Sequence, residues 1–242
     1  MNETIVSRNN AKIKEAVALK NGKGDYFLVE GFHMVEMALE SNAAAAIFSL
    51  KPYPSKARNY LVTPAVLDKL VSSRTPEGIV AVCKKKEAKP ISSTRVLILD
   101  AVADPGNVGT LFRSALAFGF KDIILGEKCA SAYSEKTLMA SQGAIFALNL
   151  VKSNDLIGSI SSLHQHGYQV FGTALKSSFY LDGAPKEISK LAIILGNEGK
   201  GVREEVLKTT DHNIRIEMAG IDSLNVAMAG SILMYSFRKL LD

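Results

Sequence analysis

The segment from Asp104 to Arg113 places two glycines, an asparagine and an arginine within ten residues. Gly106 and Gly109 permit a sharp turn and a close approach of the backbone to a ligand. Arg113 is expected about a turn and a half into the following helix, near the free N–H groups of its first turn. A guanidinium beside such groups is suited to bind phosphate. A surface arginine behind an Asn107 N-cap explains the same residues, so the segment alone leaves both interpretations open.

A second candidate is the glycine-rich run Leu195-Gly196-Asn197-Glu198-Gly199-Lys200-Gly201, which follows an apolar stretch. Three glycines in six residues mean that backbone, rather than side chains, lines the space at the end of the predicted strand. The spacing matches neither common nucleotide loop. A P-loop needs Lys-Ser or Lys-Thr after its last glycine, and the dinucleotide motif needs G-x-G-x-x-G. The run therefore indicates a ligand without identifying it.

A third candidate is Ile214–Ala227, in which a predicted strand passes through a loop containing Gly220 into a helix. Asp222, Ser223 and Asn225 crowd the start of that helix, and all three are N-cap residue types. Because one helix needs one cap, the surplus indicates that some of these polar groups face a ligand. An N-cap with more candidates than it uses also explains them.

All three segments adjoin short apolar runs of the kind that form buried parallel strands. Beyond residue 95 such runs alternate with helical patterns, which predicts an α/β fold. The predicted strands are Val96–Leu99, Ile123–Leu125, Phe146–Val151, Gln169–Gly172, Leu191–Leu195 and Ile214–Ile216, with helices near residues 108–118, 134–141, 154–166, 202–208 and 224–240. Ligands of open parallel sheets sit at the carboxyl ends of strands, so the three segments are expected to converge on one site.

The residues before 95 predict a second, smaller α/β unit. A linker is indicated by four lysines, a proline and adjacent serines between Lys84 and Arg95. Strands are predicted near residues 27–29, 46–50, 60–62 and 78–82, and helices near 8–20, 32–40 and 64–71. The chain is therefore expected to hold domains at 1–88 and 96–242, joined by residues 89–95.

Composition excludes several classes of protein. With 47% hydrophobic and 22% charged residues, the chain is typical of a folded globular protein. Two apolar uncharged runs, Thr137–Val151 and Ser223–Phe237, are 15 residues each, short of the roughly 20 that span a membrane. The first 25 residues contain no apolar signal-peptide core. Cys83 and Cys129 form neither a disulfide framework nor a zinc spacing, so a cytoplasmic protein without a structural metal is expected.

The net charge of +5 is unevenly distributed. Up to Arg95 there are 15 Lys and Arg against 9 Asp and Glu, whereas the remainder has 14 against 15. A basic half joined to a neutral half is compatible with a polyanionic partner such as nucleic acid, and equally with a solvated basic surface.

Taken together and in this order, the three segments resemble the motifs of the SpoU/TrmH family of S-adenosylmethionine-dependent RNA ribose 2′-O-methyltransferases, within the SPOUT superfamily. Asn107-x-Gly109-x3-Arg113 looks like the first motif and the glycine-rich run looks like the second. The third is similar to Ile216-x-Met218-x-Gly220-x2-Ser223-Leu224-Asn225-Val226, with Glu217 standing where members commonly carry Pro. Phe27–Gly31 and Thr75–Val82 are similar to the ends of the family's L30e-like substrate-binding domain, so the resemblance covers nearly the whole chain.

The resemblance implies a homodimer and a C-terminal domain with a deep trefoil knot. It implies that Arg113 acts at the ribose 2′-hydroxyl or its phosphate, and that Asn107, Glu198, Ser223 and Asn225 orient it or the target nucleotide. The implied cofactor-binding residues are Thr173, Ala174, Leu175, Leu195, Gly196, Asn197, Gly199, Ile216, Met218, Ser223, Leu224, Asn225 and Ala227. Candidate RNA contacts on the basic half are Arg8, Lys12, Lys14, Lys23 and Arg74.

Ribosomal RNA is the expected substrate, because the L30e-like domain favours it over tRNA. Three alternatives stay open: methylation of tRNA on ribose or base, a non-catalytic RNA-binding protein on this scaffold, and a nicotinamide or flavin oxidoreductase. The last lacks the dinucleotide fingerprint.

Overall fold

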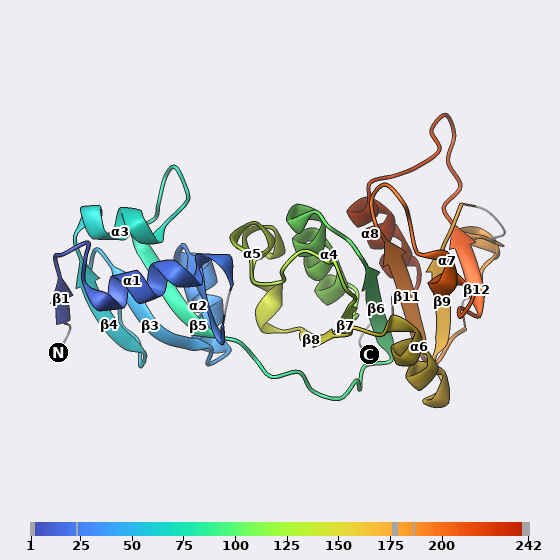
Figure 1. The fold of residues 1–242 in the computed structure, drawn as a ribbon, viewed down its shortest axis with the longest axis horizontal. Helices are drawn as coiled ribbons and strands as arrows, with labels where there is room; N and C mark the ends of the chain where they lie inside the picture. Colours follow the sequence, from blue (N-terminus) through green and yellow to red (C-terminus); the bar gives the residue numbers. More distant parts are fainter. Residues whose placement is uncertain (1–2, 23, 176–178, 186, 239–242) are drawn as a thin grey trace. The chain divides into compact units, whose positions relative to one another are not determined.

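The structure is a computed structural model of the 242-residue chain. It describes residues 3–22, 24–175, 179–185 and 187–238. The chain divides into two compact units, formed by Met1–Glu87 with Ser131–Ala147 and by Ala88–Ala130 with Leu148–Asp242. Both are α/β, as predicted, and Figure 1 shows their helices and strands. Within the described ranges, no helix is both long and apolar enough to cross a membrane.

The first unit contains a five-stranded sheet in the order β1-β4-β3-β5-β2. β1 pairs parallel with β4 and β4 with β3, whereas β5 runs antiparallel to both β3 and β2. Its elements are β1 (Glu3–Ile5), α1 (Ala11–Ala18), η1 (Leu19–Asn21), β2 (Tyr26–Glu30), α2 (Phe32–Glu40), β3 (Ala44–Ser49), β4 (Arg58–Val62), α3 (Pro64–Leu70) and β5 (Ile79–Lys84). The helix predicted near 8–20 is thus an α-helix followed by a 3-10 turn.

Residues 131–147 pack with this unit, whereas the sequence predicted them in the second domain. They contain α5 (Glu135–Ser141) and η2 (Ala144–Phe146). The ring of Phe27 lies 4.9 Å from that of Tyr133 and 5.9 Å from that of Phe146. Gly143 has φ +84°, and a Cβ there would collide with the sulfur of Met37. The predicted strand 146–151 is shorter than expected, because Phe146 ends the 3-10 turn η2 and the strand begins only at Asn149.

The second unit contains a seven-stranded sheet in the order β10-β12-β9-β11-β6-β7-β8, and all its neighbouring strands are parallel. Its strands are β6 (Arg95–Asp100), β7 (Asp122–Leu125), β8 (Asn149–Lys152), β9 (Gln169–Thr173), β10 (Phe179–Tyr180), β11 (Leu191–Gly196) and β12 (His212–Arg215). The other elements are α4 (Pro105–Ala117), α6 (Leu156–Gln165), η3 (Leu181–Gly183), α7 (Glu204–Leu207) and α8 (Val226–Ser236). Every residue of β6 and β11 is buried, as expected of central strands covered on both faces.

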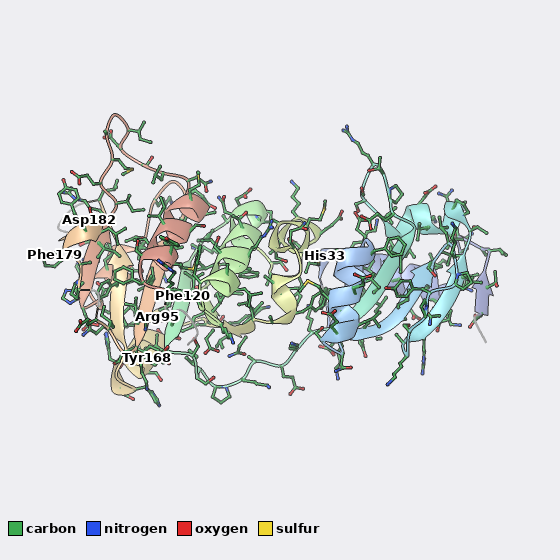
Figure 2. All side chains as sticks on the ribbon, turned by 180° about the vertical axis from the view of Figure 1, so that it is seen from behind. His33, Arg95, Phe120, Tyr168, Phe179 and Asp182 are labelled. Carbon is green, nitrogen blue, oxygen red and sulfur yellow. The ribbon has the colours of Figure 1, made fainter. Side chains whose placement is uncertain are left out.

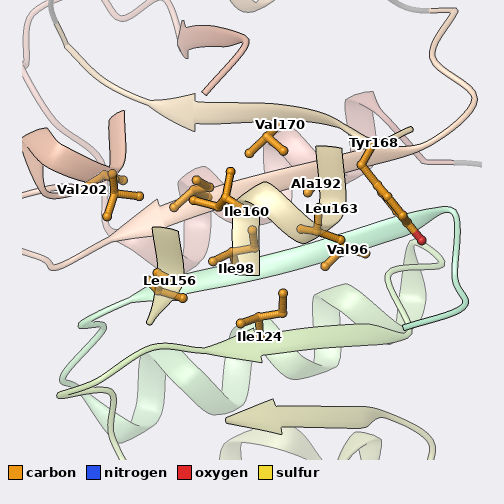
Figure 3. Close-up of a cluster of buried hydrophobic side chains, with 12 residues drawn as sticks. Val96, Ile98, Ile124, Leu156, Ile160, Leu163, Tyr168, Val170, Ala192 and Val202 are labelled. Carbon is orange, nitrogen blue, oxygen red and sulfur yellow. The ribbon is translucent and has the colours of Figure 1, made fainter. Parts of the chain in front are cut away.

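One face of this sheet packs against α6 and the residues around α7. The core there includes Ile98, Ile160, Val170 and Val206, and Figure 3 shows this cluster. The buried Arg95 is the first residue of β6. It donates to the backbone carbonyls of Ile188, Ser189 and Phe237 at 2.8–3.0 Å (Arg95 is labelled in Figure 2). This guanidinium ties β6 to the loop before β11 and to the end of α8.

Candidate active site

A cavity of about 610 Å³ lies at the carboxyl ends of β9, β11 and β12, within the size range of small-molecule sites. Parallel strands bring these ends to the same edge of the sheet. The sequence-predicted residues that line the cavity are Thr173, Ala174, Leu175, Leu195, Gly196, Asn197, Glu198, Gly199, Ile216, Met218, Ser223 and Leu224. The second and third motifs therefore converge on one site.

The glycine-rich run forms a tight turn that closes one side of the cavity. The backbones of Asn197 and Gly201 exchange two hydrogen bonds, of 3.0 and 2.8 Å. A Cβ on Gly196 would overlap the backbone of Gly201 and Val202, so only glycine lets the two segments approach this closely. The side chain of Asn197 bonds to protein groups in and beside the turn. Its Oδ1 accepts from the backbone N–H groups of Gly199 and Lys200, and its Nδ2 donates to the carbonyl of Ala101. Asn197 thus shapes the loop.

A hydrogen-bonded chain of side chains joins all three motifs beside the cavity. Asn225 Nδ2 donates to Asn107 Oδ1 at 2.9 Å, and Asn107 Nδ2 donates to Glu198 Oε1 at 3.0 Å. Glu198 also accepts from the backbone N–H groups of Asp104 at 3.0 Å and Ala103 at 3.2 Å. Each motif thereby fixes a side chain of another.

The ionised form of Glu198 is favoured in this network. Partial burial acts to raise the pKa of its carboxyl group, but the hydrogen bonds from Asn107 and from backbone N–H groups outweigh that effect and lower the pKa. An ionised carboxylate only accepts hydrogen bonds. Glu198 therefore orients the Asn107 amide so that its nitrogen faces the carboxylate and its oxygen faces Asn225.

The N-cap of α4 is not Asn107, which the sequence offered as one interpretation. α4 begins at Pro105, and its N-cap is Asp104, whose carboxylate accepts from the backbone N–H of Asn107 at 2.8 Å. The Asn107 side chain is therefore free to bond Glu198 and Asn225. The signal for this start was present in the sequence, since Asp is a favoured N-cap and Pro is favoured at the first helical position, but the prediction placed the cap at Asn107.

The polar residues before α8 divide between capping and the cavity. Asn225 is the N-cap and accepts from the backbone N–H groups of Ala227 and Met228 at 2.9 and 3.2 Å. Asp222 and Ser223 line the cavity instead. Asn225 and Ala227 are not among the lining residues, and Ala227 is buried in the first turn of α8.

Arg113 lies outside the cavity of its own chain. It is exposed on α4 and makes no hydrogen bond or ion pair with the residues that the structure describes. It is six residues beyond Asn107, which corresponds to about 9 Å along the helix axis and about 120° around it. Ser114, seven residues beyond Asn107 and therefore on nearly the same side of α4, shares a hydrogen bond of 2.7 Å with Ser231 of α8. Arg113 therefore points away from the network around Asn107.

Two charged groups at the site escaped the sequence analysis. Asp100, buried at the end of β6, accepts from Arg203 Nε at 2.8 Å and from its backbone N–H at 2.9 Å, which anchors the chain just after the glycine turn. Arg215 lines the cavity, donates from Nη1 to the Leu175 carbonyl at 3.2 Å, and lies 4.0 Å from the Tyr180 ring. Its Nε is buried and has no partner among the described residues. An isolated arginine at the end of a strand carries no sequence signal of such a role.

The candidate RNA-binding residues differ in their availability. Arg8, Lys14 and Arg74 are exposed. Lys12 is instead paired with Glu3 at 2.6 Å, and its Nζ lies 4.8 Å from the centre of the Tyr60 ring. Lys23 lies outside the described residues. No group of His, Cys, Asp or Glu side chains in the described part of the chain could hold a metal ion.

Comparisons with known proteins identify the family. The profile of the SpoU rRNA Methylase family matches residues 94–235. The 23S rRNA (guanosine(2553)-2′-O)-methyltransferase RlmP of Bacillus subtilis (strain 168) is 36% identical over 246 residues, covering 97% of this chain and 98% of that protein. The crystal structure of an AdoMet-bound rRNA methyltransferase from Sinorhizobium meliloti is 25% identical with a TM-score of 0.89, covering 99% of each chain.

A second solved structure supports the fold alone. The SpoU methyltransferase AviRb from Streptomyces viridochromogenes, in complex with AdoMet, is 21% identical with a TM-score of 0.84, covering 94% of this chain and 97% of that one. The order and spacing of the three motifs predicted this relationship, and the match over residues 94–235 confirms it. This chain belongs to the SpoU rRNA methylase family.

Proposed function

We propose that this protein transfers a methyl group from S-adenosylmethionine to a ribose 2′-hydroxyl of 23S ribosomal RNA, in the cytoplasm. The observation that carries the proposal is the single cavity formed by the second and third motifs, with the first motif hydrogen-bonded to both. The Bacillus relative, which matches over almost the whole chain, is named for this reaction on 23S rRNA.

The cavity fits the cofactor in size and in the groups it offers. Gly196 lets backbone, rather than a side chain, form one wall, and the unpartnered Nε of Arg215 offers a buried donor within the described part of the wall. Backbone groups at Leu195, Gly196, Ile216, Met218 and Leu224 would hold the adenosine, and Thr173–Leu175 would lie along its edge. When bound, S-adenosylmethionine supplies a methyl group activated by its positive sulfonium.

The residues of the chain contribute positioning and charge. In the transfer, the 2′-oxygen would form a bond to the methyl carbon while the carbon–sulfur bond breaks, and the hydroxyl would release its proton to solvent. Holding the two reactants in line is worth several kcal/mol. A guanidinium has five N–H donors and no acceptor, so Arg113 is suited to bind an anion rather than to take up the hydroxyl proton. It fixes the adjacent phosphate and stabilises negative charge that develops on the oxygen.

We further propose a homodimer in which Arg113 serves the cavity of the second copy. Arg113 does not line its own cavity, and its side chain is exposed. On α8, Met228, Ile232 and Tyr235 are 63%, 40% and 53% exposed. These residues recur at helical spacing and form one apolar stripe, which a second copy would cover. The stripe lies on the helix that packs against α4, so an interface there brings both first motifs close to it.

The trefoil knot and the role of residues 1–88 as an L30e-like RNA-binding domain also belong to this proposal. α8 follows the loop 216–225 and packs so closely on α4 and β11 that a Cβ on Gly230 would overlap Leu111 and Leu195. This close packing holds α8 against α4 and β11, and a knotted C-terminal segment would need such a fit.

The deciding experiment measures methyl transfer from labelled S-adenosylmethionine to 23S rRNA and to tRNA, followed by mapping of the modified ribose. We expect a 2′-O-methyl group in 23S rRNA alone. Arg113→Ala should reduce transfer at least a hundredfold and leave the dissociation constant of S-adenosylmethionine within a factor of two, because positioning at the reacting oxygen is lost. Methylation of tRNA alone, or of a base, would refute the assigned substrate, and wild-type turnover by Arg113→Ala would refute the role of the arginine.

A further inference from the structure

An aromatic pair with one exposed ring stands at one edge of the sheet in the first unit. Phe32, the first residue of α2, is 44% exposed, and its ring centroid lies 6.1 Å from that of Tyr53. Phe32 immediately precedes His33, which is labelled in Figure 2. β2 and β3 end at this edge and β5 begins there, because Glu30 pairs with Val80 and Ser49 with Ile79.

The backbone holds both rings in place. Gly31 has φ +90°, and the next N–H, that of Phe32, donates to Glu77 Oε2 at 2.6 Å. Tyr53 lies between Pro52 and Pro54, whose rings restrict the backbone on either side of it. Phe32 is exposed and Tyr53 is half-buried, and a pair presented on a constrained frame is suited to contact a partner with little ordering cost.

The loop that faces this pair is also pinned. Glu30 accepts from the backbone N–H groups of Ser72 at 2.9 Å and Ser73 at 3.0 Å. These bonds, with the one from Phe32 to Glu77, fix both ends of the segment that carries Arg74. The carboxylates of Glu30 and Glu77 are thus engaged by backbone donors.

Three cations lie on the segments beside the pair, together with the carboxylates of Glu30, Glu36 and Glu77. Lys51, Lys56 and Arg74 are exposed and form no ion pair with the residues that the structure describes. Partial burial raises the pKa of Tyr53, and the negative charge of Glu36, one turn along α2, raises it further. Aromatic faces flanked by unpaired cations match the chemistry of single-stranded nucleic acid: bases stack on the rings and phosphates meet the charges.

We propose that Phe32 and Tyr53 form a stacking platform for unpaired bases of the RNA substrate, with Lys51, Lys56 and Arg74 contacting the adjacent phosphates. The inference rests on the proposed RNA substrate and adds the surface that recognises it. A protein partner is the less suitable occupant, because interface cores are depleted of the lysines that surround this pair.

The test measures RNA affinity by fluorescence anisotropy with two probes. One is a transcript of the 23S rRNA segment that contains the nucleotide named for the Bacillus relative, and the other is an unstructured oligoadenylate of about 20 nucleotides. We expect Phe32→Ala and Tyr53→Ala each to weaken binding of both probes about tenfold. Phe32→Trp should bind within a factor of two of the wild type, since it keeps an aromatic face.

Matched controls separate stacking from charge and from folding. Tyr26→Ala removes a ring that is 38% exposed at the opposite end of β2, and it should leave affinity unchanged. Phe32→Ala should keep the wild-type salt dependence, whereas Arg74→Gln should make it shallower because one phosphate contact is lost. Thermal unfolding and S-adenosylmethionine affinity should not change in any of these variants.

Wild-type affinity in Phe32→Ala and Tyr53→Ala for both probes, or an equal loss in Tyr26→Ala, would overturn the platform. So would failure of the wild-type protein to bind either RNA. If the transcript does not bind but oligoadenylate still requires both rings, the platform stands and the proposed 23S substrate is wrong. A protein that binds RNA through this pair yet does not bind S-adenosylmethionine would likewise refute the proposed function alone.

Discussion

Removal of the Asn107 side chain isolates the link between the three motifs. Asn107→Ala deletes the bond to Glu198 at 3.0 Å and the bond from Asn225 at 2.9 Å. The backbone N–H of residue 107 remains, so the Asp104 cap of α4 is preserved. Because alanine favours the helix, any loss of function cannot be assigned to a weaker helix.

The expected magnitude follows from the two bonds. A hydrogen bond to an ionised carboxylate contributes roughly 1.5–3 kcal/mol when buried, but Glu198 is exposed, so about 1 kcal/mol is appropriate. The neutral amide–amide bond to Asn225 adds roughly 0.5–1.5 kcal/mol. If the ligand requires the glycine turn and the start of α8 in their present positions, about 1.5–2 kcal/mol is lost. We therefore expect S-adenosylmethionine to bind about tenfold to thirtyfold more weakly.

A double-mutant cycle with Glu198→Ala, which removes the acceptor of the Asn107 amide, measures the shared bond. Titration calorimetry on the wild type, the two single variants and the double variant should give a coupling of about 1 kcal/mol, which is about fivefold in the dissociation constant. Thr110→Ala, at an exposed position on the same helix, serves as the control and should bind as the wild type does. Additivity within about 0.3 kcal/mol would refute the reasoning, because it would mean that the bond does not support the ligand-binding arrangement.

Two further predictions concern pH and the dimer. The folded-state pKa of Glu198 is lowered, so its contribution to stability is present above the pKa of the unfolded chain and is lost as the pH falls through the folded value. Acid titration of the free energy of unfolding should therefore show a drop in the carboxyl range that is smaller in Glu198→Gln, and an identical drop in both proteins would contradict the assignment. For the dimer, Arg113→Ala is co-expressed with Ala174→Phe, which places a ring in the cavity. Random pairing makes about half of the dimers mixed. If Arg113 serves the second copy, each mixed dimer has one complete site of two, so about a quarter of wild-type transfer should return. Complete inactivity of the isolated mixed dimers would mean that each arginine serves its own cavity.

The sequence by itself determined the α/β class, the central strands and the family. Apolar runs such as Val96–Leu99 and Leu191–Leu195 are local signals, because a strand buried on both faces must be apolar along its length. The glycine-rich run is local in the same way: Gly196 and Gly201 are required by the geometry of one tight turn. These features depend on neighbouring residues, so they could be predicted without coordinates.

The tertiary structure decided which side chains meet. Asn107 is 91 residues from Glu198 and 118 residues from Asn225, and nothing in the local sequence pairs them. The placement of residues 131–147 with the first unit likewise depends on contacts such as that between the rings of Phe27 and Tyr133.

Exposure was also beyond the sequence. Phe32 sits in an apolar helical pattern that is typical of a core position, yet its ring is exposed. Arg113 belongs to the first motif, yet it does not line the cavity of its own chain. A linear pattern specifies the period of a helix or strand, but the direction in which a side chain faces depends on which elements pack around it.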